Sequence, residues 1–478
     1  MQRKSGILMH ISSLYGDYST GTFGKNALDF IDFIKSEGFS VWQVLPFTLT
    51  DDHNSPYKSL SAFAGNPYFI DPEILFEKGL VSRSDLEGAK QSTPYYCEFD
   101  RLSKERLALL EKASRNFKDW DKANEFLSSR PHLDNFCRFM ALRAENGNKP
   151  WQEWEINEIS DDSVLKTWQF IQYEFFTEWD AVKKYAEEKG VSIIGDIPIY
   201  VSDDSCDVWE NKKLFEVNSK GYPEQVAGVP PDYFASEGQL WGNPLYNWDE
   251  MKKDGYAWWR ERMAHTLSMF DGVRIDHFRA IESYWSVPAS EKTAVNGKWI
   301  KGPGMDFVNA IKEGNEDKLI IAEDLGDITD EVRALVEESG FPGMRIFQFA
   351  FLGDGDSLHQ PHNYVKNSVA YTGTHDNNTI FGYLWECSDS ERQRMLEYVN
   401  FPGGDWGHAS PLLIREVFKS VSELAIIPIQ DFLMYGSDTR LNTPGVAGGN
   451  WSYRVTKEQL LSADLEFFKN LNRIYRRW

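Results

Sequence analysis

The chain has 478 residues, 41% of them hydrophobic, so it can bury a large core in one barrel or in several domains. Its formal net charge of −22 would repel phosphate backbones and anionic headgroups, which argues against nucleic-acid and membrane-surface partners. The segment MQRKSGILMH shows no signal-peptide pattern, and no apolar run reaches the roughly 18 residues that a membrane span needs. Four scattered cysteines without a CxxC pair fit a reducing compartment, so we expect a soluble, cytoplasmic protein.

Short apolar runs rich in Val and Ile predict parallel strands that are covered on both faces. Eight such runs lie at 6–14, 41–47, 191–201, 271–278, 318–325, 343–351, 368–376 and 424–432. Helical patterns separate most of them, at 25–37, 329–340, 409–423 and 455–472 among others. The alternation predicts an α/β fold, a closed (β/α)8 TIM barrel, whose active site would lie at the C-terminal ends of the strands.

Two long segments interrupt this alternation, after the second and the third predicted strand. Both contain helical patterns and neither is of low complexity, so we expect ordered insertions over the mouth of the barrel. The expected organisation is a single catalytic barrel over residues 1–478. An insertion subdomain would span about 48–190, and a second insertion, about 202–250, would carry a substrate-binding loop.

Three acidic residues directly follow predicted strands in the second half of the chain. They are Asp276 in GVRIDHFR, Glu323 in LIIAEDLG and Asp376 in AYTGTHDNN. Carboxylates at such positions would meet at the mouth of the barrel. A pocket with several carboxylates suits carbohydrate chemistry, which needs a nucleophile and a general acid on opposite sides of one glycosidic bond.

The first of these carboxylates has an arginine two positions before it. Arg274 and Asp276 would point to the same face of their strand, and the arginine would hold the carboxylate ionised and oriented as a nucleophile. His277 would point the other way, unless the strand has already ended. An ion pair that merely stabilises the rim of the barrel explains Arg274 and Asp276 equally well.

The other two carboxylates leave similar alternatives open. Glu323 follows an apolar run that would raise its pKa, as a general acid requires, but Asp324 could be the acid instead or could cap a helix. The His375-Asp376 pair, followed by Asn377 and Asn378, could bind sugar hydroxyls or form a turn with an Asx cap. A metal site built on the histidines is a third interpretation, which no HxH or HExxH spacing supports.

Aromatic residues make up 14% of the chain, and most of them must fill the core. Several, however, lie in Gly/Pro/Asn-rich stretches such as GNPYF, PPDYF and LWGNPLYNW, where a loop is expected. Exposed rings in loops suit sugar binding, because they stack against the C–H faces of pyranoses.

Several motifs taken together resemble the 4-α-glucanotransferases of glycoside hydrolase family 77, the amylomaltases or disproportionating enzymes, which are relatives of the α-amylases. These motifs are GVRIDHFR, IIAEDLG, YTGTHDNNT, WQVLPF, SPYKSLSAFAGNPYFID, GDIPIYVSDDSCDVW, AGVPPDYFASEGQLWGNPLYNW, DTRLNTPG and GNWSYR. They cover essentially the whole chain. The resemblance implies a (β/α)8 barrel without the C-terminal β-domain of α-amylases.

The resemblance also implies roles for matching residues. Asp276 would be the nucleophile, Glu323 the general acid/base and Asp376 the transition-state stabiliser, with Arg274 and His375 assisting. Sugar-binding positions would be Tyr57, Asp196, Tyr233, Phe234, Trp241 and Asn450. No cofactor or metal is implied.

The implied reaction is retaining transfer of α-1,4-glucan segments through a covalent glucosyl-enzyme. The donors would be malto-oligosaccharides, starch or glycogen-derived dextrins, and the acceptor the 4-hydroxyl of glucose, maltose or another glucan. An α-amylase-type hydrolase would use the same carboxylates with water as acceptor. A non-catalytic glucan-binding protein would not need all three carboxylates together.

Two segments depart from the family pattern. GDYSTGTFG (16–24) stands where a GIGDLG-like sequence is more common, and Glu237 stands where a small or hydroxyl residue is more usual. The first would affect a rim loop. The second could alter acceptor preference or loop mobility, and neither removes a catalytic group.

Overall fold

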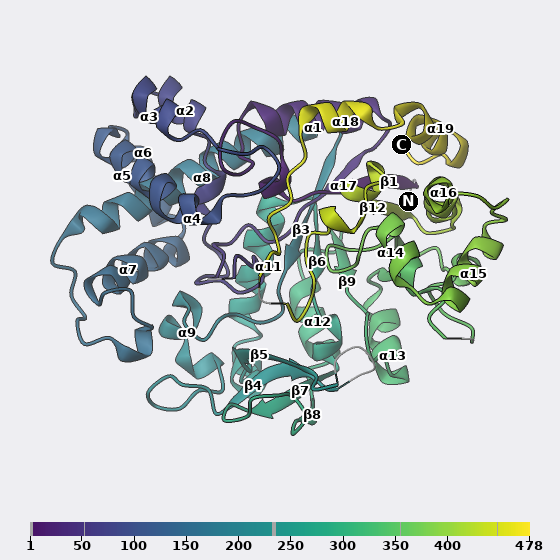
Figure 1. The fold of residues 1–478 in the computed structure, drawn as a ribbon. Helices are drawn as coiled ribbons and strands as arrows, with labels where there is room; N and C mark the ends of the chain where they lie inside the picture. The colour runs from purple at the N-terminus through teal and green to yellow at the C-terminus, as the bar shows by residue number, and fades with distance from the viewer. Residues whose placement is uncertain (1–2, 52, 232–235, 354, 447) are drawn as a thin grey trace.

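The computed structural model describes residues 3–51, 53–231, 236–353, 355–446 and 448–478. Parallel strands form a closed barrel at its centre (Figure 1). In chain order they are β1 (Lys4–Leu8), β2 (Val41–Gln43), β3 (Ser192–Ile197), β6 (Gly272–Ile275), β9 (Leu319–Ala322), β10 (Gly343–Ile346), β11 (Ser368–Tyr371) and β12 (Leu424–Pro428). Each of the eight predicted runs overlaps one of these strands, and all but the first contain it whole, so the predicted TIM barrel is confirmed.

Every strand is shorter than the apolar run that predicted it. The run 6–14, for example, leaves the sheet after Leu8 and enters a 3₁₀ turn at Ile11–Ser13. The apolar residues beyond the strand ends stay buried because loops and helices cover the mouth. Apolar composition therefore reports burial rather than hydrogen-bonded strand length.

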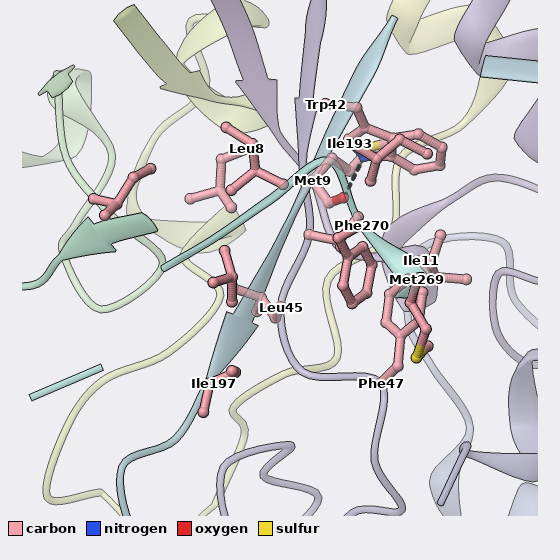
Figure 2. Packing of buried hydrophobic residues seen from close by; sticks show 14 of the residues in the cluster. Leu8, Met9, Ile11, Trp42, Leu45, Phe47, Ile193, Ile197, Met269 and Phe270 are labelled. Carbon is pink, nitrogen blue, oxygen red and sulfur yellow. Dashed lines mark hydrogen bonds between the residues drawn. The ribbon is translucent and has the colours of Figure 1, made fainter. Parts of the chain in front are cut away.

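Aromatic rings fill the space between the strand ends and helix α8 (Asp162–Lys189). The Phe47 ring meets the Trp179 ring edge to face, with centroids 4.7 Å apart, and also packs on Phe270. Trp42 Nε1 donates a hydrogen bond of 2.7 Å to the Met9 carbonyl, which joins the first two strands beyond their ladder. Figure 2 shows the bond from Trp42 to Met9 and the rings of Phe47 and Phe270, with Leu8, Ile11, Leu45, Ile193, Ile197 and Met269 around them.

The outer helices follow the sequence pattern closely. α13 (Asp330–Ser339) begins with Thr329 accepting from the Val332 backbone and ends at Gly340, whose φ of 73° only glycine adopts readily. The other outer helices are α1 (Lys25–Ser36), α8 (Asp162–Lys189), α11 (Ala257–Met269), α12 (Met305–Lys312), α14 (Ile380–Glu386), α15 (Asp389–Tyr398), α16 (Ser410–Lys419), α17 (Ile429–Phe432), α18 (Lys457–Ser462) and α19 (Leu465–Tyr475).

One predicted helix is divided. The pattern at 455–472 becomes α18 and α19, because Ala463 is extended and the Asp464 side chain caps a new helix at the Phe467 backbone N–H. The chain between β10 and β11, as far as it is described, forms 3₁₀ turns rather than an α-helix. None of the described helices is long and apolar enough to span a membrane.

The insertion between β2 and β3 is helical and lies to one side of the barrel (Figure 1, upper left). It consists of α2 (Pro72–Glu77), α3 (Arg83–Gly88), α4 (Phe99–Arg101), α5 (Leu107–Asn116), α6 (Trp120–Ser128) and α7 (Pro131–Glu145), which lead into α8. The insertion after β3 includes α9 (Cys206–Glu210) and α10 (Trp248–Lys253). Both ordered insertions were predicted.

A second sheet, which the sequence analysis did not predict, lies below the barrel in Figure 1. Its antiparallel strands run in the order β5-β4-β7-β8, where β4 is Gln225–Val229, β5 is Gln239–Pro244, β7 is Ser283–Pro288 and β8 is Lys298–Lys301. Two strands precede β6 and two follow it, so neither loop looks like a sheet by itself. The sheet ties the loop after β3 to the loop after β6.

Candidate active site

Asp276 begins the site, directly after β6. Arg274 Nη2 donates to Asp276 Oδ1 at 2.8 Å, while Nη1 donates to both carboxylate oxygens of Asp196 at 2.9 and 2.8 Å. Asp196 lies on β3, paired in register with Arg274. The Asp196 side chain is 0% exposed and that of Asp276 is 30% exposed. The arginine therefore anchors itself on one buried carboxylate and orients the other toward the mouth.

This arrangement keeps the guanidinium charged. Burial opposes the charge, but the carboxylates of Asp196 and Asp276 raise the pKa of Arg274 well above its usual value. The backbone N–H of Asp276 also donates to the Ile197 carbonyl at 2.9 Å, the last link between the ends of β3 and β6.

Glu323 follows β9 and has a buried carboxyl group. Its Oε2 accepts from the His277 backbone N–H at 2.6 Å, and its Oε1 accepts from the Leu325 backbone N–H at 2.9 Å. Burial raises the pKa of Glu323 to about 8; Arg274 opposes the shift, and Asp276 adds to it. The group is accordingly protonated at neutral pH and able to donate its proton.

His277 holds an unusual backbone conformation that serves this contact. The strand ends at Ile275, and His277 has φ 51°, the left-handed region, which turns its N–H toward Glu323. Its ring is buried, and burial lowers the pKa of His277 to about 3, with Arg279 adding to the effect.

Asp324, the alternative acid, has a different environment. Its Oδ1 accepts from the Met344 backbone N–H at 2.6 Å and its Oδ2 from Arg345 Nη1 at 3.2 Å. These bonds join the end of β9 to β10. Of the two interpretations left open for Asp324, helix capping is not what the structure shows, because β10 rather than a helix supplies its donors.

Asp376 stands in the turn after β11 and is more open, with 42% of its side chain exposed. Its Oδ1 accepts from Asn442 Nδ2 at 2.6 Å, and its main-chain carbonyl accepts from Arg440 Nη2 at 2.7 Å. His375 Nε2 lies 3.4 Å from Asp376 Oδ2. The Asn377 side chain accepts from the Thr374 backbone N–H, three residues earlier, and the Thr374 hydroxyl accepts from the Asp376 N–H at 3.3 Å, so the turn is closed by Thr374 and Asn377 rather than by the Asx cap that was one interpretation of the sequence.

Tyr57 links the helical insertion to the strand ends. Its hydroxyl donates to Asp196 Oδ2 at 2.8 Å. Its ring stacks on His375, with centroids 5.1 Å apart and planes 16° from parallel, and touches Trp451 at 5.8 Å. Burial, followed by the charge of Asp196, raises the pKa of the Tyr57 hydroxyl well above its usual value.

Trp241 lies on β5 of the second sheet and contacts the site through His277. Its ring meets the His277 ring at 84°, with centroids 4.8 Å apart. The Asn450 side chain instead holds its own loop, accepting from Thr443 N at 3.0 Å and donating to the Val446 carbonyl at 2.7 Å. Tyr233 and Phe234 lie outside the described residues.

Asn442, Arg440 and Trp451 were missed by the sequence analysis. They lie in DTRLNTPG and GNWSYR, motifs from which only Asn450 was selected. No sequence pattern indicates which residue the side-chain amide of Asn442 will contact, because its partner Asp376 lies 66 residues earlier in the chain. Trp451 has φ 65°, an uncommon conformation for a tryptophan, which presents its ring to Tyr57 and His375.

The two departures from the family pattern lie away from the strand-borne carboxylates. Residues 16–24 run between β1 and α1. Glu237 has an exposed side chain, and its carbonyl accepts from the Ala294 N–H at 3.0 Å. Within the described ranges, no group of three or more His, Cys, Asp or Glu side chains is arranged to hold a metal ion.

Comparison with known proteins agrees with this architecture. The model of glycoside hydrolase family 77, described as 4-alpha-glucanotransferase, matches residues 9–460. A 4-alpha-glucanotransferase of Streptococcus pneumoniae is 44% identical over 100% of this chain and 98% of its own length. The corresponding protein of Thermus thermophilus is 40% identical over 96% of both chains. The amylomaltase from Streptococcus agalactiae in complex with acarbose superposes with a TM-score of 0.95 at 38% identity, over 100% of both chains.

A barrel whose strand ends gather carboxylates has the architecture of an enzyme, with the acidic groups that reactions at glycosidic bonds require. The chain belongs to glycoside hydrolase family 77, the family of the 4-α-glucanotransferases. The resemblance noted from the sequence motifs is thereby confirmed.

Proposed function

We propose that the chain transfers α-1,4-glucan segments by a retaining double displacement, from malto-oligosaccharides or starch-like donors to the 4-hydroxyl of glucose, maltose or another glucan. One observation carries this proposal. A protonated carboxyl group, Glu323, lies beside a carboxylate, Asp276, that Arg274 holds toward the mouth. These are the two groups that a retaining mechanism requires.

In the first step Asp276 attacks the anomeric carbon of the donor. The glycosidic C–O bond breaks, and the leaving oxygen takes the proton of Glu323. A covalent glucosyl ester on Asp276 results, and the non-reducing part of the donor remains bound. Asp376, held by Asn442 and Arg440, would stabilise the positive charge that develops on the sugar ring.

In the second step the same residues act in reverse. Formation of the ester removes the negative charge of Asp276, which is one of the influences that raise the pKa of Glu323. The pKa of Glu323 therefore falls, so the group stays ionised after donating its proton and can take the proton of the acceptor 4-hydroxyl as the ester bond breaks. The charge coupling between the two carboxyl groups supports both of its roles.

The choice between transfer and hydrolysis depends on the acceptor side. We propose that Trp241 and the loop 228–248, with Tyr233 and Phe234, cover the acceptor and exclude water.

Residues 1–478 would act as one catalytic unit, in which the insertions of about 48–190 and 202–250 shape the mouth. The four cysteines are free and buried, as suits a cytoplasmic enzyme.

Incubation with maltotriose followed by product analysis tests the proposal. A ladder of longer and shorter oligosaccharides is expected, with retention of the α-anomer. Glucose and maltose alone would establish a hydrolase, and no change in the maltotriose would establish a protein that only binds glucans. The variant Glu323→Gln serves as the inactive control, and Asp327→Asn, at an exposed carboxylate nearby, as the active one.

A further inference from the structure

Arg279 lies in the 3₁₀ turn Phe278–Ile281 that follows β6, and neither step of the proposed reaction uses it. Its side chain is only 3% exposed. A buried charge is costly unless it is paired and hydrogen-bonded, so the partners of this guanidinium show what it holds together.

The guanidinium of Arg279 joins two loops. Its Nη1 donates to the main-chain carbonyl of Asp327, in the loop after β9, and its Nη2 donates to Ser283 Oγ at 3.1 Å, at the start of β7. The Asp327 carboxylate is exposed and lies 3.7 Å away. An exposed ion pair at that distance contributes little, so the carbonyl is the contact that matters.

These contacts bear on the carboxyl group of Glu323, which accepts from the backbone N–H groups of His277 and Leu325. His277 comes two residues before Arg279, and Leu325 comes two residues before Asp327. The guanidinium therefore bonds the segment that supplies one donor to the segment that supplies the other. It is a side-chain link that sets how far apart the two donors lie.

The ring of Trp299, on β8, covers the guanidinium. The Cζ atom of Arg279 lies 3.8 Å from the ring centroid, a distance at which the cation is attracted to the face of the indole. Trp299 is 37% exposed, so it can be replaced with less damage to the core than a buried ring. The second sheet thus limits where the guanidinium can move.

One row of residues across the second sheet leads from this ring to the strand of Trp241. Trp299 pairs with Trp285 on β7, and the centroids of their rings are 5.1 Å apart. Trp285 pairs with Gly228 on β4, which pairs with Leu240 on β5, the residue before Trp241. The sheet that carries the acceptor-side tryptophan therefore also carries the ring that covers Arg279.

We propose that Arg279 is a positioning residue for Glu323, and that the second sheet keeps it in place through Trp299. The role of Glu323 itself rests on the proposed function. While the guanidinium holds the Asp327 carbonyl, the Leu325 N–H stays on the carboxyl group. Without it, the loop after β9 can move away and take this donor with it. A displacement of about 1 Å at a reacting group can lower a rate by roughly 100-fold.

The ionisation of Glu323 reports on its backbone donors. The charged groups that face it are Arg274 and Asp276 after β6 and Asp324 at its own strand end, and the His277 ring is neutral because burial lowers its pKa to about 3. A donor to the carboxylate favours the ionised form, so losing one should raise the pKa of Glu323. Removing a nearby positive charge would act in the same direction, so one variant must keep that charge.

Steady-state transfer of maltotriose and first-turnover release of fluoride from α-maltosyl fluoride test the proposal together. Fluoride leaves with its electron pair and needs no proton, so its release requires Asp276 but not a well-placed acid. Arg279→Met should lower kcat for maltotriose by about 10- to 100-fold and the rate of the fluoride burst by less than about threefold. Arg279→Lys keeps the charge and one donor site, and should restore part of kcat.

The pH profile of kcat/KM gives the second readout. Trp299→Ala keeps the charge of Arg279, and should lower kcat for maltotriose by about two- to fivefold. It should also move the alkaline limb upward by roughly half a pH unit to one pH unit. Trp385→Ala, at an exposed tryptophan of α14, and Asp327→Asn, which keeps the main-chain carbonyl, should change neither quantity. Circular dichroism and Tm check that every variant folds.

The outcomes separate this inference from the proposed function. Wild-type kcat and an unmoved alkaline limb in Arg279→Met and Trp299→Ala would overturn the inference and leave the proposed function standing. Equal losses on maltotriose and α-maltosyl fluoride would also overturn it, since Arg279 would then support the whole site rather than Glu323. A wild-type chain that acts on neither compound would overturn the proposed function itself.

Discussion

The two kinds of side chain at the barrel mouth are held in different ways. Arg274, Asp276 and Glu323 lie on or directly after barrel strands. They are fixed by hydrogen bonds of 2.6–2.9 Å, some within their own strand ends and others across to Asp196 of β3 and from the His277 N–H after β6. Trp241 lies on an added sheet and is fixed by a ring contact with His277 and one bond of 3.2 Å to Gln239. We call groups on or directly after the barrel strands strand-borne, and groups on the segments inserted between barrel strands, including the added sheet, loop-borne. We infer that the strand-borne groups determine whether bonds are broken, whereas the loop-borne groups determine which acceptor completes the reaction.

The largest expected effect is on the strand-borne carboxylates. Asp276→Asn and Glu323→Gln should each lower the rate of maltotriose transfer by about 10³-fold or more, because they remove a nucleophile and a proton donor. Circular dichroism and Tm should show an intact fold. Retention of more than about a tenth of the wild-type rate in either variant would contradict the assignment.

A smaller effect is expected from the loop-borne ring. Trp241→Ala should weaken acceptor binding by roughly 1–3 kcal/mol, the scale for burying a large apolar side chain. Formation of the glucosyl-enzyme should suffer less, so the ratio of hydrolysis to transfer should rise. The measurement is released reducing ends against disproportionation products at fixed maltotriose. An unchanged ratio with a lower Tm would show that Trp241 only packs.

The pH dependence of the reaction sharpens the role of Glu323. Its pKa of about 8 leaves the acid form dominant at neutral pH. Because a general acid must be protonated, kcat/KM for maltotriose should be flat near pH 7 and fall by about tenfold per unit above pH 8. Asp327→Asn provides the matched control and should leave the profile unchanged. A rate that stays constant to about pH 9.5 would exclude Glu323 as the acid.

The smallest expected effect concerns metals. Dialysis against EDTA should leave transfer unchanged, because the proposed mechanism assigns every charge and proton to protein side chains. Activity that disappears on dialysis and returns with calcium or zinc would show that a metal ion takes part in the reaction beside the strand-borne and loop-borne side chains.

The barrel was predictable from the sequence because its strands are largely buried and lie in short apolar runs rich in Val and Ile. The second sheet was not, since β8 (Lys298–Lys301) is a four-residue segment with a lysine at each end and no alternation of polar and apolar residues. Its partner β7 finds its other neighbour in β4, which precedes the barrel strand β6 in the chain. Sheets assembled across an intervening strand leave little local signal.

The candidate site shows the same limit. Arg274 and Asp276 are two residues apart, so their shared direction follows from strand geometry alone. The bond from His277 N to Glu323 depends on a left-handed residue that strand periodicity cannot anticipate. The bond from Asn442 to Asp376 depends on a loop whose path is set by tertiary packing.

Closure of the barrel also bears on how the chain folds. β1 pairs with β12 from Lys4 with Leu424 to Leu8 with Pro428, so the first strand finds one of its two neighbours near the far end of the chain. Arg477, fully buried, donates to the carbonyls of Lys4, Phe418, Ser420 and Ser422 across this seam. Contacts of such long sequence separation form late, because the entropy of loop closure must be overcome first. During synthesis on the ribosome, β1 must therefore keep one edge unpaired until β12 has emerged.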